Sequence, residues 1–533
     1  MVATSVISAG QPRRWWAAAL WAVFGVIAVV SSVLVLRRPL SDRLSDLHIY
    51  YGAAQTVRAG DPLYGYVAEN GGPFTYPPFA VLLFEPMTFV PESVLRILWL
   101  LATCAAAAAI AVALGRAGVA GDRHRPVAVA AIACGVLLSA PAQSNLRFGQ
   151  VSILIVLLAL VDGAGLTPAR LRGVLVGIAA AIKLTPLLFI VYFLLAKRYR
   201  DAARAAGTFA ACAAVAFAVL PADSWRYWTG TMLQTSRIGD LASLGNQSVH
   251  GMLLRAGVAP DALPLVWAAL VALVCGAALL RARHLHRHGH PARATVMVGC
   301  ATIAASPVSW THHQLWTVLA AMVLIAAEGA LRRMAGVVLL AVMTVSVGVL
   351  LRGISTYPGW QFTLENARAV GAVAVCLAGL GGVTVVAAAY VRRAGGARAW
   401  LRGATATAAI LACVALLPLP AAADPTFKAY TAADLANPRY FYFAEPLPPG
   451  APVVFGVRRE KTKVRVNGVV DPAVARLEFH SAPGGSARDI PVLVTADGTR
   501  TFSFRSANLA HGRLDALDGH GRVLATFSEE LDP

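Results

Sequence analysis

The segment Trp15–Leu36, with the sequence WWAAALWAVFGVIAVVSSVLVL, is 22 residues long and carries no charge. An apolar α-helix needs about 20 residues to cross the hydrocarbon core of a bilayer, so this segment predicts a membrane-spanning helix. Two arginine pairs flank it, Arg13-Arg14 before and Arg37-Arg38 after. Because no small-residue cleavage site follows a short apolar core, we expect an uncleaved first helix and not a signal peptide.

The composition of the whole chain indicates that this span is one of many. The 533 residues are 57% hydrophobic and only 14% charged, and the mean hydropathy is +0.63. A soluble protein of this length could not bury so much apolar surface. We expect an all-α polytopic membrane protein with about 11–13 transmembrane helices. Its apolar segments fall near residues 15–36, 94–114, 127–141, 151–163, 173–183, 186–196, 203–220, 263–280, 294–309, 314–331, 335–351, 369–391 and 403–420.

The net charge of +19 is unevenly distributed along the chain. Residues 424–533 hold 13 basic and 13 acidic residues, so the whole excess lies in residues 1–423. Short basic loops of a membrane protein face the cytoplasm, and the pattern therefore predicts topology and contact with membrane lipids, not binding of nucleic acid. With a cytoplasmic N-terminus, the C-terminal residues lie outside. The basic loops are Arg116–Arg125, Lys197–Arg204, Arg281–Arg293, Arg332-Arg333 and Arg392–Arg402.

Polar residues interrupt two pairs of short apolar segments. Gln143–Gln150 divides the first pair, and Lys183–Pro186 divides the second. Polar backbone at membrane depth is tolerated only where protein buries it or water reaches it, so we expect these interruptions to line a cavity that opens outward. The cations Lys183 and Arg147 then mark a functional site, although either side chain could instead extend to a nearby interface.

A carboxylate, Asp46, follows the first span and is followed in turn by aromatic residues and prolines. An acid held at the outer face of the membrane is where a polytopic enzyme would deprotonate an acceptor, and Asp46 is the candidate base. Tyr50 and Tyr76 shape the same loop. Asp61 is a rival base, but within Gly60-Asp61-Pro62 it is more typical of a turn.

Two later outer loops also carry polar side chains in apolar surroundings. Asn246 lies in the first, which is followed by Arg255, and the second contains His312 and His313. Adjacent histidines could ligate a metal, but no carboxylate or cysteine nearby completes such a site. The pattern favours hydrogen bonds to a phosphate or a sugar over structural packing and over metal binding. We expect no metal and no cofactor.

The composition changes after Asp424. Runs such as Lys463–Val466 and Thr501–Arg505 alternate apolar and polar residues, and predicted turns at Asn467-Gly468, Asp497-Gly498 and Asp518-Gly519 separate such runs. This pattern predicts a small antiparallel β-domain. We therefore divide the chain into a transmembrane domain, residues 1–423, and a β-rich domain, residues 424–533. Contact with envelope carbohydrate and a plain packing role both remain open for the second domain.

Taken in order, these motifs resemble a known family. The chain is similar to the GT-C superfamily of membrane glycosyltransferases. Within it, the chain is most similar to family 87, the polyprenol-phosphate-mannose-dependent α-mannosyltransferases of actinobacteria, of the type that acts on phosphatidylinositol mannosides. The resemblance covers most of residues 40–400 and leaves the β-domain outside. It rests on Asp46–Tyr51, Gly60–Tyr64, Tyr76–Pro78, Arg147–Val151, Lys183–Pro186, Asn246–Ser248 with Gly251 and Arg255, and Ser306–His313.

The resemblance implies a GT-C-like fold and an activity. A mannosyl or other hexosyl residue would pass from a polyprenyl-phosphate sugar to an envelope glycolipid or glycan, with inversion, to give an α-glycoside. The enzyme would lie in the cell membrane, with its active site and C-terminal domain on the extracytoplasmic face. The implied roles are those of the base for Asp46, of donor phosphate or sugar binding for Arg147, Gln150, Lys183, Arg255, His312 and His313, and of acceptor binding or loop shaping for Tyr50, Asp61, Tyr76 and Asn246.

Two other classes of function fit part of the pattern. A transporter or flippase for an envelope lipid or glycan precursor would also have broken helices and buried charges. Its acidic residue should lie near the bilayer centre, however, whereas Asp46 follows the span. A non-catalytic envelope scaffold, acting through the β-domain, is the third hypothesis. Neither of these accounts for the ordered motifs.

Overall fold

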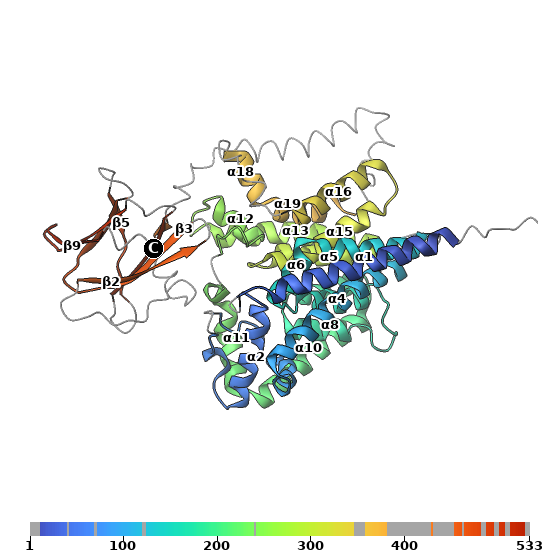
Figure 1. Ribbon diagram of the computed structural model, residues 1–533. Coiled ribbons are helices and arrows are strands. Elements are labelled where there is room, and N and C mark those ends of the chain that lie inside the picture. The colour runs from blue at the N-terminus through green and yellow to red at the C-terminus, as the bar shows by residue number, and fades with distance from the viewer. Residues whose placement is uncertain are drawn as a thin grey trace, which may run out of the picture. The chain divides into compact units, whose positions relative to one another are not determined.

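The computed structural model of this chain describes residues 11–39, 42–68, 72–119, 124–238, 241–345, 358–380, 428–429, 452–460, 463–480, 487–494, 500–506 and 512–527. The chain forms two units, which are described separately. One is helical and the other is built of strands (Figure 1). The domain boundary expected at residue 424 and the apolar segment 403–420 lie outside the described residues.

The helical unit consists of α-helices joined by short loops and single 3₁₀ turns. The turns are η1 (Leu63–Gly65), η2 (Glu85–Phe89), η4 (Thr185–Leu187), η5 (Thr231–Leu233), η6 (Thr235–Ile238) and η7 (Thr311–His313). The helices are α1 (Gln11–Leu36), α2 (Ser45–Arg58), α3 (Pro78–Phe84), α4 (Glu92–Arg116), α5 (Arg125–Leu138), α6 (Ala140–Phe148), α7 (Ser152–Gly163), α8 (Val174–Ile182), α9 (Leu188–Leu195), α10 (Tyr199–Val219), α11 (Pro221–Thr229), α12 (Val249–Arg255), α13 (Leu263–Arg287), α14 (Pro291–Ala305), α15 (Leu315–Ile325), α16 (Ala330–Thr344), α18 (Pro358–Glu365) and α19 (Ala367–Ala378).

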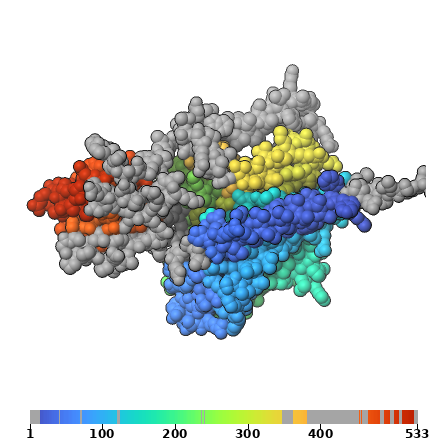
Figure 2. Space-filling view, viewed as in Figure 1, coloured from blue at the N-terminus to red at the C-terminus, as the bar shows by residue number. Residues whose placement is uncertain are grey.

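Four helices within the described ranges are long and apolar enough to cross a membrane, at Arg14–Leu36, Glu92–Arg116, Tyr199–Val219 and Leu263–Arg287. Only 11% of the apolar window of α1 is buried within the protein. In Figure 2, α1 accordingly lies along the surface of the helical unit, as expected of a helix that faces lipid. The mostly helical, membrane-embedded fold is confirmed. The count of about 11–13 crossings stays a prediction.

The polar stretch Gln143–Gln150 is mostly helical. α5 and α6 are bent by 60° at Ser139, and together they pass as one broken span or a re-entrant loop. Gly149 ends α6 with a φ of +66°, and a Cβ at this position would lie 2.7 Å from the Cβ of Leu47 in α2. The backbone N–H of Leu44 donates to the carbonyl of Arg147 at 2.8 Å. Glycine at position 149 therefore lets the start of α2 pack closely against the end of α6.

The second interruption follows α8. Lys183 has an extended backbone, with φ −151° and ψ 127°, and η4 and α9 follow it. The break in the helix therefore lies where the sequence predicted it.

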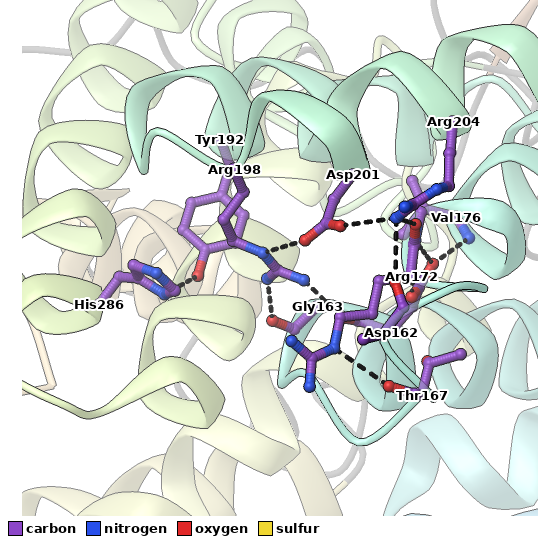
Figure 3. Close-up of polar contacts among 12 residues, drawn as sticks. Asp162, Gly163, Thr167, Arg172, Val176, Tyr192, Arg198, Asp201, Arg204 and His286 are labelled. Atoms are coloured by element: carbon purple, nitrogen blue, oxygen red, sulfur yellow. Dashed lines mark hydrogen bonds and ion pairs between the residues drawn. The ribbon is translucent and has the colours of Figure 1, made fainter.

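The other ends of α7 and α8 are tied together by a polar network (Figure 3). Asp162 at the end of α7 accepts N–H bonds from Gly173 and Val176 at the start of α8, at 2.8–3.0 Å. Arg198 donates to the carbonyls of Asp162 and Gly163 and pairs with Asp201 at 2.7 Å. Part of the predicted basic loop Lys197–Arg204 is thus engaged in holding helices together. The opposite ends of these two helices lie at Ser152, where α7 begins, and next to Lys183, which follows α8.

The strand unit is a sandwich of two antiparallel sheets. One has the order β1-β7-β3-β2 with β6 also paired to β7, and the other has the order β5-β4-β8-β9. Phe504 of the first sheet and Phe479 of the second pack with ring centroids 4.8 Å apart, so the sheets share one core. The strands are β1 (Lys428–Ala429), β2 (Val453–Glu460), β3 (Lys463–Val470), β4 (Arg476–His480), β5 (Ala487–Ile490), β6 (Leu493–Val494), β7 (Arg500–Ser506), β8 (Arg513–Leu517) and β9 (Val523–Phe527).

The turn prediction at Asn467-Gly468 is wrong. These residues lie inside β3, where Gly468 pairs with Phe455 and Phe502 on its two neighbouring strands. Asn467 is buried and accepts a hydrogen bond from the Ser503 hydroxyl, so packing between strands overrides the local preference for a turn. Asp518-Gly519 does form the turn between β8 and β9. Asp497-Gly498 lies outside the described residues.

Candidate active site

Asp46 lies in the first turn of α2 and is half-buried. The N–H groups of a first helical turn have no partners within the helix, and they stabilise a negative charge there. The contacts of Leu44 and Leu47 with the end of α6 fix this turn. The carboxylate is therefore held on a short helix distinct from the four long apolar helices.

Gln150 connects Asp46 to a group of buried hydroxyls. Its Nε2 donates to Oδ2 of Asp46. Its Oε1 accepts from the hydroxyls of Tyr50 at 3.2 Å, Tyr76 at 3.1 Å and Ser152 at 3.3 Å. The two tyrosine hydroxyls also lie 2.9 Å apart. Side chains from α2, the loop before α3 and the start of α7 thus meet at one amide group.

The two tyrosines act as neutral donors. Burial raises the pKa of both phenols above the ordinary value of 10, and the negative charge of Asp46 raises each further. Both hydroxyls therefore stay protonated at any physiological pH. Among the side chains of this cluster on α2 and its loop, Asp46 is the carboxylate and therefore the candidate base.

Lys183 lies beside this cluster. Its Nζ is 5.2 Å from the ring centroid of Tyr76, and it lies within electrostatic reach of Asp46. On its other side, Nζ is 2.5 Å from Nε2 of His313. The backbone N–H of Trp310 donates to Nδ1 of His313 at 3.1 Å, which fixes the orientation of the imidazole ring. Lys183 therefore contacts the His313 imidazole directly and lies within electrostatic reach of the Asp46 carboxylate.

The ring of His312 packs edge-on against that of His313, with ring centroids 4.3 Å apart. It is buried, and its Nδ1 is 3.5 Å from the hydroxyl of Ser144. Its Nε2 has no hydrogen-bond partner among the described residues. A buried imidazole nitrogen of this kind is expected to have a partner in the working protein.

Lys183 and His313 help to line a pocket that is partly open to solvent. Hydroxyl groups line part of it, and apolar side chains line the rest. This mixture suits a ligand with a hydroxyl-rich part and an apolar part. Residues that line the pocket include Ser152, Thr185, Ser309, Ile155, Val156 and Trp316.

Within the described parts of the chain, no group of three or more histidine, cysteine, aspartate or glutamate side chains is arranged so that it could hold a metal ion. The expectation that the site uses no metal stays a prediction. The sequence predicted a common site for Asp46, Tyr50, Tyr76, Gln150, Lys183, His312 and His313, and the structure brings these residues together.

Arg147 and Asp61 lie near the two ends of α2. Arg147 donates twice to Oδ1 of Asp42, at 2.9 and 2.6 Å. Burial raises the pKa of Asp42, but the guanidinium groups of Arg147 and Arg38 outweigh it and hold the pKa below the ordinary 3.8. Asp61 is exposed beyond the far end of α2, roughly 18 Å of helical rise from Asp46.

Arg255 and Asn246 hold a second loop in place. Arg255 donates to Oδ1 of Asn366 at 2.6 Å and to the carbonyl of Asn246 at 2.9 Å. The buried Asn246 side chain donates to the carbonyls of Leu241 and Pro307 and accepts from the N–H of Ser309. Both residues thus brace the segment that leads to the histidines.

Arg368 is a residue that the sequence reasoning missed. It is only 5% exposed, and it donates to the hydroxyl of Thr311 at 3.0 Å and to the carbonyls of Val342 and Val345. These bonds anchor η7, which carries His312 and His313. An arginine directly before an apolar segment reads as an interfacial residue, so the sequence alone gave no signal of this contact.

Comparison with known proteins identifies the family. The profile of glycosyltransferase family 87 matches residues 74–307, a range that contains Gln150, Lys183 and Arg255 but neither Asp46 nor the two histidines. No solved structure matches the chain.

Three curated relatives come from mycobacteria. A polyprenol-phosphate-mannose-dependent alpha-(1-2)-phosphatidylinositol mannoside mannosyltransferase of Mycobacterium tuberculosis is 32% identical over 301 residues, which cover 52% of this chain and 69% of the relative. The enzyme of the same name from Mycolicibacterium smegmatis is 30% identical over 330 residues, with 56% and 73% covered. A pentamannoside mannosyltransferase of the latter organism is 33% identical over 283 residues, with 51% and 67% covered. The chain belongs to glycosyltransferase family 87.

Proposed function

We propose that this membrane glycosyltransferase moves a mannosyl residue from a polyprenyl-phosphate mannose to a mannosylated phosphatidylinositol or a related envelope glycolipid. The names of the relatives support this donor and this acceptor class. One observation carries the proposal for the site: the Asp46 carboxylate lies within electrostatic reach of the Lys183–His313 pair, beside a pocket lined by hydroxyls. A base and a phosphate-binding cation are the two groups that transfer from a phosphosugar needs.

The proposed reaction is a single inverting displacement. The acceptor oxygen forms a bond to C1 of the mannosyl group while the bond from C1 to the phosphate oxygen breaks. The acceptor proton passes to Asp46, and the bonding electron pair leaves with the polyprenyl phosphate. A β-linked donor then gives an α-mannoside. One base is enough for this chemistry, because no covalent intermediate forms.

The remaining residues fall into three proposed groups. Lys183, His313 and His312 stabilise the phosphate, on which charge develops as the bond breaks. Arg147, Arg255 and Asn246 support the site through the segments they brace, because their side chains hydrogen-bond to other protein groups. Tyr50 and Tyr76 line the part of the site in which the acceptor would lie.

We propose that the site opens on the extracytoplasmic face. Arg198 and Arg204 lie at the end of the α7–α8 pair opposite to Ser152 and Lys183. Short basic loops favour the cytoplasmic side, and this supports an extracytoplasmic position for the other end of the pair. Asp46, in the first turn of a short helix, does not lie at the midpoint of a long span, which is where a transporter would carry its acid.

The test uses the purified full-length protein in vesicles. It is incubated with radiolabelled polyprenyl-phosphate mannose and a panel of phosphatidylinositol mannosides, with the Asp46→Asn variant as the inactive control. We expect a radiolabelled mannolipid with a new α-linkage from the wild-type protein alone. Failure to label any member of the panel, while the protein still binds the donor, would contradict the proposed acceptor class.

A further inference from the structure

The side chain of Gln150 uses both ends of its amide within the protein. The residue is 5% exposed and lies between Gly149 at the end of α6 and Ser152 at the start of α7. Its nitrogen donates a hydrogen bond to the Asp46 carboxylate, and its oxygen accepts hydrogen bonds from the hydroxyls of Tyr50, Tyr76 and Ser152.

Chemistry fixes which way this amide points. An ionised carboxylate only accepts hydrogen bonds, so the amide group facing Asp46 has to be the donor, Nε2. The oxygen then faces the three hydroxyls, each of which has a proton to donate. The reverse orientation would set an amide oxygen against a carboxylate oxygen. The three hydroxyls and the carboxylate therefore hold the amide in a single orientation.

We propose that Gln150 is a positioning residue for Asp46, an inference that rests on the proposed function. Its N–H group holds Oδ2 of Asp46, fixes the rotamer of the carboxylate and favours the charged form that accepts the proton. Tyr50, Tyr76 and Ser152 act one step further away, because they orient the amide. The resemblance to the family had instead implied a role for Gln150 in binding the donor phosphate or sugar, and the two roles differ in their kinetics.

Several charged or titratable groups surround Asp46. Tyr50 lies on the same helix, Tyr76 precedes α3, and Lys183 follows α8 with His313 behind it. The Asp42–Arg147 ion pair lies at the N-terminal side of α2. Replacement of Gln150 leaves all of these groups in place, so a change in the pH profile reports the loss of the amide.

The test compares Gln150→Met with wild type. Methionine keeps the unbranched shape and lacks both hydrogen-bonding groups. We expect kcat for transfer from polyprenyl-phosphate mannose to fall about 10- to 100-fold while KM for the donor changes less than about threefold, because an orienting bond is lost and a substrate contact is not. The acid limb of the kcat/KM profile should move to higher pH, because a carboxylate without its N–H donor protonates more easily.

Gln143→Met is the matched control. Gln143 is also a partly buried amide in this region, but it donates to Ser31 and to the carbonyl of Leu137. We expect wild-type kcat and an unchanged acid limb. If Gln150→Met does not fold, the double variant Tyr50→Phe/Tyr76→Phe replaces it. That variant removes two of the three hydroxyls that orient the amide, and it should move the acid limb in the same direction by a smaller amount.

The outcomes separate the two roles of Gln150 and also separate this inference from the proposed function. A raised donor KM with unchanged kcat would make Gln150 a donor-binding residue and overturn the inference. A pH profile and a kcat of Gln150→Met that match those of Gln143→Met would also overturn the inference. In that case the proposed function would still stand if the wild type is active and Asp46→Asn is not. An inactive wild-type protein would overturn both.

Discussion

At the scale of single residues, the site places one carboxylate opposite one cation. Asp46 gains stabilisation of its negative charge from the first turn of α2 and from Gln150. Lys183 lies 5.2 Å from the ring centroid of Tyr76 and pairs with His313. Mutations can test the proposed roles of this carboxylate and this cation separately.

Asp46→Asn removes the proposed base and keeps the shape of the side chain. We expect transfer to fall by about two to four orders of magnitude, with donor binding and the thermal unfolding temperature nearly unchanged. Initial rates with radiolabelled donor measure the first quantity. Asp61→Asn is the matched control, since Asp61 is exposed at the other end of the helix, and it should keep wild-type rates. If Asp61→Asn lost transfer and Asp46→Asn kept it, the role of the base would pass to Asp61.

Lys183→Met removes the ammonium group and keeps most of the stem. Transfer should fall about 100-fold or more, because the leaving phosphate loses a charged donor in a site of low dielectric constant. Arg255→Met is the comparison. Arg255 holds Asn366 and a loop carbonyl, so its replacement should lower the unfolding temperature more than Lys183→Met does. Equal transfer rates in Lys183→Met and wild type would remove Lys183 from phosphate binding.

At the scale of elements, the packing of α2 against α6 depends on Gly149. Gly149→Ala adds a Cβ that would lie 2.7 Å from the Cβ of Leu47, in a left-handed conformation that costs about 1–2 kcal/mol without glycine. We expect a lower unfolding temperature together with a loss of transfer, because α2 has to shift and Asp46 shifts with it.

Gly165→Ala isolates the backbone part of that cost. Gly165 has a φ of +76°, close to the +66° of Gly149, and nothing lies within 4 Å of a Cβ built there. The variant should lose stability and keep the transfer rate of the molecules that remain folded. If both variants lose transfer equally, the contact with Leu47 does not position Asp46.

The sequence predicts the helical class and most of the cluster, because apolar length and polar interruptions are local signals. Lys183 breaks a helix where an apolar run stops, and that position was foreseeable. The 60° bend at Ser139 was not, since Gln143–Gln150 is compatible with either a loop or a helix. The sequence suggests a ligand-binding role for Arg147 and Arg255, because it gives the charge and order of these residues but not the side chains that they contact. Asp42 and Asn366 are their partners in the structure.

At the scale of the whole molecule, the chain combines a helical unit and a β-sandwich, and the proposed topology puts the sandwich outside the cell membrane. The turn Asp518–Gly521 exposes His520, while backbone N–H bonds from His520 and Arg522 to Asp518 fix the turn. His520→Cys should therefore react with a membrane-impermeant thiol reagent in intact cells whose outer envelope admits the reagent.

Arg200→Cys is the control for this topology. Arg200 is exposed in the basic segment Lys197–Arg204, which the positive-inside pattern assigns to the cytoplasm. We expect labelling of this variant only after the membrane is permeabilised. Labelling of His520→Cys only after permeabilisation would place the sandwich inside and remove any role for it in contacting an envelope acceptor.

The proposed base and the proposed phosphate-binding cation belong to different parts of the chain. Asp46 lies on α2, Lys183 follows α8, and His313 precedes α15. Such a division lets a lineage alter one substrate while it conserves the other. We therefore expect substitutions around α2 to change the choice of acceptor and to leave the use of the activated sugar donor unchanged.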